Sequence, residues 1–359
     1  VRLLPALLGV SAAALGAALL VLAERTLYGA DHVAYWSFSR QLAHLLGEDP
    51  WSALQWLSTS VATRELNLLP AAPVAMLMQL LGDGRLAYIL ILVAVYGGAA
   101  LVAFVMTVDH LRPAPAPAGR RVVALLATIL LFSSLWGPVM RGQPGVGGVA
   151  LAFAVLALHL DRPAERQTVA RLALMGVLIA MLFLFRRWYA FWSVGFGVVV
   201  VVESLVGLSR AGGAGWSQRV RHLRAPLVVG LASLATVALL AFPVARRILA
   251  TDYSDSFSAY KVYGSLGAEL AAGAAHFGWL TVAAVAVAAV GLLRRRRHLR
   301  PLAVATGLGL VAFVMMRRIQ DPSPHHYYLY LPGLMLIVGL YLAVVAEEAR
   351  IGVRARVVS

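Results

Sequence analysis

Long apolar runs separated by short polar segments form the main pattern along this chain. Most of the runs are close to the roughly 20 residues that a helix needs to cross a bilayer. Helices are expected in them because a helix satisfies its own backbone hydrogen bonds in lipid. We predict ten membrane spans, over residues 3–23, 86–108, 122–139, 146–160, 169–185, 189–208, 226–244, 277–293, 302–316 and 329–346.

The polar segment between the first two spans, residues 24–67, has a different pattern. Apolar residues recur at helical spacing over residues 32–46 and again over residues 51–63, which predicts two amphipathic helices. Asp49 followed by Pro50 is typical of a helix start, with an N-cap acid and proline at the first helical position. We expect both helices to lie on the outer membrane surface.

The remaining segments predict a single membrane domain over residues 1–359. The apolar run at residues 66–81 is short and contains two prolines, so we predict a surface or re-entrant segment there. A second outer loop is expected at residues 249–276. The first run is longer than a usual signal-peptide core, so a retained span is expected. No polar segment is long enough for another domain, and no soluble C-terminal domain is predicted.

Composition agrees with a polytopic membrane protein, since 61% of the 359 residues are apolar and 13% are charged. The net charge is +15, but most cations fall in short loops that the ten-span topology places inside, including Arg294 to Arg297. This bias predicts cytoplasmic N- and C-termini and contacts with membrane lipids. No nucleic-acid-binding motif is present. Cysteine is absent, which excludes disulfides, thiol catalysis and Cys-ligated zinc.

The stretch YGADHVAYW, residues 28–36, contains the leading candidate for catalysis. Asp31 follows the first span by a few residues, so its carboxylate is expected near the outer bilayer surface. A carboxylate there can deprotonate a polar acceptor while a lipid-linked substrate lies beside it. The alternative is an ordinary solvated loop acid. Glu65 is the next candidate base.

Arginines at the outer ends of spans oppose the positive-inside bias and therefore call for a partner. A guanidinium binds phosphate oxygens through paired hydrogen bonds and stays charged near lipid. We therefore predict a phosphate site where such ends converge. The alternatives are contacts with anionic lipid, or pairing with Asp252, Asp255 and Asp321. The arginines concerned are Arg141, Arg186, Arg187, Arg246, Arg247, Arg317 and Arg318.

Most tryptophans also fall on the outer side, where an interfacial aromatic belt is the alternative to sugar stacking. The segment FRRWYAFW, residues 185–192, is predicted to frame a glycan. The outer segment at residues 250–264 has a composition suited to ligands rich in hydroxyl groups, with a solvated connector as the alternative. In the outer segment at residues 320–330, His325 and His326 are candidates to bind phosphate, shuttle a proton or bind a metal. The candidate substrate-binding residues are His32, Tyr35, Glu65, Trp188, Tyr189, Lys261, His325, His326 and Tyr327.

Other motif classes are missing from the sequence. There is no Walker A loop, dinucleotide fingerprint, GxSxG elbow or HExxH. The glycine-rich run GQPGVGG, residues 142–148, is interpreted as a tight turn that exposes Arg141 and Gln143. Adjacent histidines at 325 and 326 are weak evidence for metal, so no metal site is predicted. No cofactor is certain, and a divalent cation remains possible.

The stretch YGADHVAYW…DPW…ELNLLPAAPVAMLMQLLGDGRLAYI, residues 28–89, resembles the GT-C glycosyltransferases. It is most similar to the bacterial branch of arabinose-, mannose- and galacturonosyl-type transferases that use polyprenyl-phosphate sugars. The resemblance implies a GT-C-like helical bundle and a catalytic base at Asp31. It also implies that Arg186 and Arg187, with Arg317 or Arg318, hold the donor phosphate. Many members have two adjacent acids, whereas His32 follows Asp31 here.

The expected activity is inverting transfer of a sugar from a polyprenyl-phosphate donor to a glycan, lipid or protein acceptor. The resemblance implies that it occurs on the outer face of a bacterial cytoplasmic membrane. The alternatives are a transporter or flippase and a non-catalytic subunit. A transporter needs ionisable groups within spans, and only His159 and Glu203, near inner ends, come close.

Overall fold

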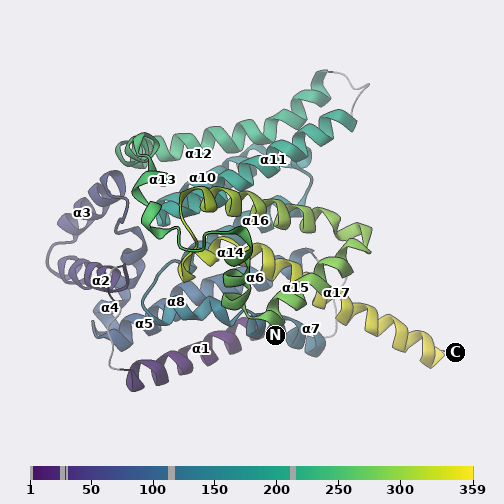
Figure 1. The fold of residues 1–359 in the computed structure, drawn as a ribbon, viewed down its shortest axis with the longest axis horizontal. Coiled ribbons are helices and arrows are strands. Elements are labelled where there is room, and N and C mark those ends of the chain that lie inside the picture. The colour runs from purple at the N-terminus through teal and green to yellow at the C-terminus, as the bar shows by residue number, and fades with distance from the viewer. Residues whose placement is uncertain (1–2, 25–28, 30, 112–117, 211–215, 359) are drawn as a thin grey trace.

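The structure is a computed structural model and describes residues 3–24, 29, 31–111, 118–210 and 216–358. Every regular element in these ranges is helical (Figure 1). The α-helices are α1 (Leu4–Ala23), α2 (Asp31–Glu48), α3 (Pro50–Thr63), α4 (Ala72–Leu81), α5 (Arg85–Leu92), α6 (Gly98–Leu111), α7 (Ala118–Leu131), α8 (Trp136–Met140), α9 (Val146–Asp161), α10 (Val169–Phe185), α11 (Ala190–Arg210), α12 (Trp216–Ala250), α13 (Tyr253–Ser256), α14 (Leu266–Phe277), α15 (Trp279–Leu293), α16 (Leu299–Ile319) and α17 (Leu331–Val358).

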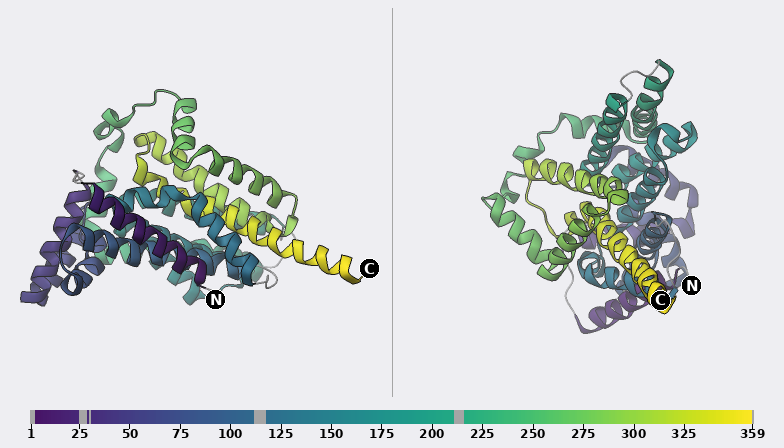
Figure 2. Two further views of the ribbon diagram at one scale, coloured as in Figure 1. Left: turned by 90° about the horizontal axis from the view of Figure 1, so that it is seen from below. Right: turned by 90° about the vertical axis from the view of Figure 1, so that its right-hand side faces the viewer.

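The long helices lie side by side, and the shorter helices α2, α3 and α4 form a layer at one end of them (Figure 1). The further views show α2 and α3 at this end and the C-terminal end of α17 at the opposite one (Figure 2). Within the bundle, α10 packs against α9 and α12, α6 against α9, and α11 against α16. The layer is held together because α2 packs on both α3 and α4.

The two helices predicted in the first outer segment are present as α2 and α3. The carboxylate of Asp49 accepts hydrogen bonds from the backbone N–H groups of Trp51 and Ser52, at 3.1 and 3.2 Å, and Pro50 occupies the first turn. The short apolar segment after α3 is a 3₁₀ turn followed by the ten-residue α4. A helix of this length is too short to cross a bilayer, as its two prolines indicated.

Within the described ranges, six helices are long and apolar enough to cross a membrane. Two further pairs, α7 with α8 and α14 with α15, are each bent and bring the number to eight if each pair is one span. The other two predicted spans are α9 and α10, with 16 and 17 residues. The predicted number of ten is therefore not confirmed, because residue pattern alone does not reveal bends or short buried helices.

Three boundaries differ from the prediction for identifiable reasons. The residue 249–276 segment is not simply a loop, since it contains α13 and α14. Gly278 follows α14 and allows a 99° bend into α15. Its φ is +85°, a backbone conformation that residues other than glycine rarely adopt. α12 is longer than its predicted span and deviates from helical geometry at Ala241, two residues before Pro243, whose ring disrupts the preceding turn.

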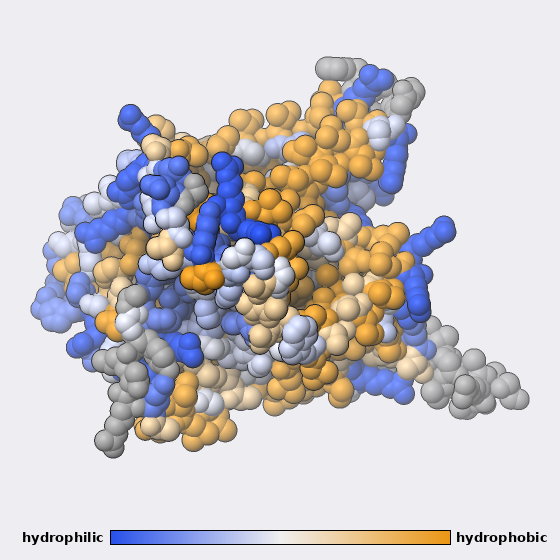
Figure 3. All heavy atoms as spheres, viewed as in Figure 1, coloured by the Kyte–Doolittle hydropathy of each residue, from blue (hydrophilic) through white to orange (hydrophobic). Residues whose placement is uncertain are grey.

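The surface agrees with a membrane environment. Figure 3 shows hydrophobic residues over the middle of the bundle and hydrophilic residues gathered at its two ends. Leu15 and Leu22 on α1 are 63% and 71% exposed, and Leu239 on α12 is 85% exposed. Exposed apolar area of this extent is rare in water-soluble monomers. The outward faces of α1 and α12 are therefore the faces expected to contact lipid.

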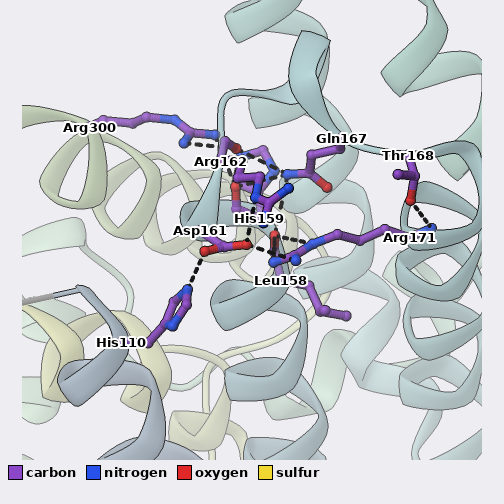
Figure 4. A network of polar contacts seen from close by, with 9 residues as sticks. All are labelled: His110, Leu158, His159, Asp161, Arg162, Gln167, Thr168, Arg171 and Arg300. Carbon is purple, nitrogen blue, oxygen red and sulfur yellow. Dashed lines mark hydrogen bonds and ion pairs between the residues drawn. The ribbon is translucent and has the colours of Figure 1, made fainter.

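A polar network ties several helices together at the end of α9 and the start of α10 (Figure 4). Arg171 forms an ion pair with Asp161 at 2.7 Å, and His110 pairs with the same carboxylate. Arg300 and His159 pair with Glu203 at 2.8 and 2.9 Å. The transporter alternative would use the ionisable groups of His159 and Glu203. Both groups are therefore engaged in contacts between helices. This network lies at the opposite end of α9 and α10 from α2.

Candidate functional site

Asp31 is the first residue of α2 and lies directly beside Arg186. The Arg186 Nη2 donates a 2.8 Å hydrogen bond to the Asp31 Oδ2. The carboxylate is 36% exposed whereas the arginine side chain is 5% exposed. The start of a helix also favours a carboxylate, because the helix dipole is positive there. The acid is thus fixed on one side by a buried cation and remains reachable from solvent on the other.

Arg186 occupies the junction between α10 and the 3₁₀ turn Arg187–Tyr189, where its extended backbone (φ −153°, ψ 123°) turns the chain. Its guanidinium lies over the rings of Tyr35 at 5.0 Å and Trp188 at 5.7 Å. Its Nη1 is buried and has no hydrogen-bond partner among the described residues. A buried guanidinium nitrogen without an acceptor is costly, so Arg186 is suited to bind one more anionic oxygen.

A second ion pair adjoins the first. Arg187 pairs with Glu65, and Arg247 of α12 approaches the other oxygen of Glu65 at 3.5 Å. Arg247 also donates to the backbone carbonyl of Thr63 at 2.9 Å. One carboxylate thus serves two arginines here. Together the two ion pairs bring the C-terminal ends of α3, α10 and α12 to the start of α2.

The 3₁₀ segment Pro324–Leu329 closes the other side of the site. The ring centroid of His325 lies 5.9 Å from that of Trp188, and His326 lies 5.5 Å from it. His326 is fixed in place because its Nδ1 accepts from the backbone N–H of Ser323 at 3.0 Å. Both predicted histidines therefore border the same site as Asp31.

The electrostatics of the site keep the acid charged and the histidines neutral. Burial would raise the pKa of Asp31, but the Arg186 cation and its hydrogen bond outweigh burial and hold that pKa below its usual 3.8. Burial and then the Arg186 charge lower the pKa of His325 to about 3. Burial, with help from Arg141 and Arg186, also lowers the pKa of His32 despite the neighbouring Asp31.

The glycine-rich run at residues 142–148 positions the site by close packing. A Cβ on Gly148 would lie 2.0 Å from the ring of Tyr189, and one on Gly145 would lie 3.0 Å from Tyr328. Only glycine allows such approach. The turn does expose Arg141, which lines a small pocket with His32. Gln143, however, is buried at 1% exposure, so the prediction that it is exposed was wrong.

The predicted aromatic frame is only partly accessible. Trp188 and Tyr189 stack at 4.4 Å and are both buried, and the Tyr189 hydroxyl donates to the Gly145 carbonyl at 2.9 Å. Trp192 is fully buried and stacks on Phe196. These rings thus form the packed support under Arg186. Trp192 is a core residue because α11 turns it inward, which residue type alone could not reveal.

Other predicted site residues lie elsewhere. Arg317 pairs with buried Glu269 of α14 at 3.3 Å, and Tyr327 stacks on His276, also of α14, at 4.2 Å. Arg317 and Tyr327 therefore contact α14 and form a group separate from the Asp31 site. The acids that pair with Arg186, Arg187, Arg247 and Arg317 are Asp31, Glu65 and Glu269, and sequence inspection had not singled out Glu269. Of the remaining predicted site residues, Arg246, Arg318 and Lys261 are exposed.

Asn67 was also missed, although it links the segment after α3 to the site. It is 5% exposed, and its Nδ2 donates to the carbonyl of Leu184 at 2.8 Å, two residues before Arg186. Its Oδ1 accepts from the backbone of Leu69 at 2.9 Å. A polar residue inside the apolar stretch before Pro70 was the available signal.

No group of three or more His, Asp or Glu side chains in the described ranges could hold a metal ion. His325 and His326 adjoin each other but are directed toward Trp188.

Comparison with known proteins adds information on the fold. Neither a protein-family model nor a curated protein matches the sequence. Among solved structures, the crystal structure of ArnT from Cupriavidus metallidurans, bound to undecaprenyl phosphate, matches with a TM-score of 0.58 at 17% sequence identity. The chain folds like ArnT.

The match covers 92% of this chain and 59% of ArnT, so the chain spans about three fifths of that protein. The predicted fold class, an all-α polytopic membrane protein, is confirmed by the shared fold and the apolar helices. The resemblance of residues 28–89 to the GT-C glycosyltransferases, and the branch within that family, stay predictions.

Proposed function

We propose that this chain transfers a sugar from a polyprenyl-phosphate donor to an acceptor at the outer face of a membrane. The observation that carries the proposal is the contact between Asp31 and Arg186. It places a reachable carboxylate next to a buried guanidinium that has an unused nitrogen. The fold shared with ArnT, whose structure holds undecaprenyl phosphate, supports the same donor class.

The reaction is a single displacement. Asp31 takes the proton of the acceptor hydroxyl as that oxygen attacks the anomeric carbon of the donor sugar. The new glycosidic bond forms as the bond from the anomeric carbon to the phosphate oxygen breaks. The bonding electrons leave with the polyprenyl phosphate, and the configuration at the anomeric carbon is inverted. The proton passes from Asp31 to water after the product departs.

Arg186 stabilises the departing phosphate. The leaving oxygen gains negative charge in the transition state, and a fixed guanidinium directed at it lowers the barrier. Arg187 adds a second cation beside it, with Glu65 holding that arginine in place. A phosphate leaves readily without protonation, so the site needs no general acid. The neutral state of His325 agrees with this division of roles.

The test is transfer of radiolabelled sugar from a panel of polyprenyl-phosphate sugars, in membranes that contain the protein and candidate acceptors. We expect label to move from one donor class and to depend on the protein. Membranes without the protein are the control. Donor consumption without a glycosylated product would indicate hydrolysis, and movement of the intact donor across the membrane would indicate a flippase. Either result in place of transfer contradicts the proposal.

The pH dependence of transfer gives a prediction. Because the folded-state pKa of Asp31 lies below 3.8, the base stays ionised as the pH falls, and kcat/KM should show no acidic limb between about pH 5 and 8. The lowered pKa also affects stability. The Asp31–Arg186 ion pair stabilises the fold at pH values above the pKa that Asp31 has in the unfolded chain. This stability is lost as the pH falls through the lower pKa that Asp31 has in the folded protein.

The matched variant is Arg186→Gln, in which burial still raises the pKa of Asp31 but the cation that lowers it most is gone. Its acidic limb should therefore move to higher pH. The measurement is kcat/KM against pH for both proteins. If kcat/KM of the unmodified protein instead fell on the acidic side with a midpoint near pH 6.5, the titrating group would be a histidine with its ordinary pKa.

A further inference from the structure

The layer of α2, α3 and α4 contains an open groove that the proposed reaction does not use. Its volume is about 930 Å³, within the range of roughly 300–1,000 Å³ typical of small-molecule sites. Trp36 of α2 and Trp56 of α3 form part of its lining, and Met78 of α4 contributes an apolar surface. Both tryptophans are half-buried. The Trp36 ring already contacts Arg40 at 5.7 Å and stacks on Tyr88 at 6.5 Å, so Trp56 is the ring that offers surface to a ligand.

Polar groups accompany the aromatic rings in the groove. The side-chain amide nitrogen of Gln79 donates to the carbonyl of Ala43 at 2.8 Å, and that of Gln41 donates to a serine hydroxyl at 3.1 Å. Each amide oxygen therefore remains an acceptor. Arg40 uses its Nε for a 2.8 Å bond to Asp83, and the other nitrogens of this exposed guanidinium remain donors. Acceptors and donors thus alternate around aromatic surface.

The groove and the Asp31 site are on different faces of α2. Asp31 and Tyr35 face Arg186, whereas the groove is lined by residues 33–45 at other helical positions, which cover about 18 Å at 1.5 Å per residue. A small second pocket, lined by His32, Trp36 and Arg141, adjoins the groove at the N-terminal end of α2. The small pocket shares Val33 and Trp36 with the groove and extends it toward His32, the residue next to Asp31.

The chemistry of the groove fits a saccharide. Sugar rings present C–H groups that stack on indole faces and hydroxyl groups that both donate and accept. A lipid chain would leave the amides and the guanidinium without partners. The groove also lies at the end of the molecule where hydrophilic residues gather, away from the hydrophobic middle of the bundle (Figure 3).

We propose that this groove binds the non-reacting sugars of a saccharide-bearing acceptor and leads the reactive hydroxyl past His32 to Asp31. The proposal rests on the transferase function proposed above and names the acceptor class for that same site. Trp56 is the most informative residue, because it lines the groove but not the smaller pocket near Asp31.

The first experiment measures binding without turnover. The Asp31→Asn protein, in lipid nanodiscs, is applied to a glycan array, and the affinity for the strongest ligand is then measured in solution. Trp56→Ala in this background should weaken binding roughly tenfold, a plausible cost of one aromatic contact. Trp56→Phe keeps a stacking face and should retain most of the affinity. Trp51→Ala is the matched control, since Trp51 lies on α3 at 67% exposure and does not line the groove.

The outcomes separate this proposal from the proposed function. Failure to bind any glycan, equal affinity in Trp56→Ala and Trp51→Ala, or displacement of the glycan by palmitate would overturn the saccharide site. In the active protein, Trp56→Ala should raise the acceptor KM roughly tenfold with the donor KM unchanged. An unchanged acceptor KM with intact transfer contradicts only the groove. Absence of transfer by the unmodified protein, with groove binding retained, contradicts only the transferase function.

Discussion

Replacing Asp31 by Asn should lower sugar transfer by about 10²- to 10⁴-fold, the usual contribution of a general base. Asparagine keeps the shape of the side chain and can still accept a hydrogen bond from Arg186, so the fold should persist. It cannot take a proton from the acceptor hydroxyl. The measurement is the initial rate of transfer by purified protein, at equal amounts of correctly folded wild type and variant.

The matched control for this variant is Glu48→Gln. Glu48 is an exposed acid at the opposite end of α2, so its amide should leave transfer unchanged while altering the helix charge by the same amount. Full activity in a folded Asp31→Asn protein would remove Asp31 from the mechanism. Glu65 would then be the candidate base, although two arginines already contact its carboxylate.

Replacing Arg186 by Gln should reduce transfer by about 10²- to 10³-fold, as expected when one fixed donor to a developing negative charge is removed. The donor KM should rise as well, because the guanidinium is proposed to contact the phosphate in both the ground state and the transition state. Arg186→Lys should recover part of the loss, since it restores charge but lacks the paired donors of a guanidinium. The measurement is kcat and donor KM for each variant.

Arg246→Gln is the matched control for the arginine series. Arg246 lies near the C-terminal end of α12, the end that approaches the site. It is exposed and forms no ion pair with the described residues. Its loss should leave both kinetic constants unchanged even though the net charge falls by the same amount. Equal effects of Arg186→Gln and Arg246→Gln would mean that the arginines act only through the overall potential, which contradicts a specific phosphate contact.

Local features of the sequence were sufficient for several elements. The apolar runs identified a helical membrane protein, because lipid demands helices with apolar surfaces. Asp49 and Pro50 determined where α3 begins, since capping depends on residues next to one another. The position of Asp31 soon after the first span identified it as the leading candidate acid. Each of these inferences needed only neighbouring residues and the environment that their side chains require.

Tertiary structure alone decided which of these residues meet. Asp31 and Arg186 are 155 positions apart, and Glu65 and Arg187 are 122 apart, so no local pattern could choose these partners among the other arginines of the chain. Packing between helices also turned Trp192 into the core and bent the chain at Gly278. Burial and pairing depend on the contact of distant surfaces, whereas helix formation and capping depend on residues close in the chain. The sequence alone therefore determined the membrane class and the candidate acid, and only the folded chain selected the arginine and assembled the groove of α2 to α4.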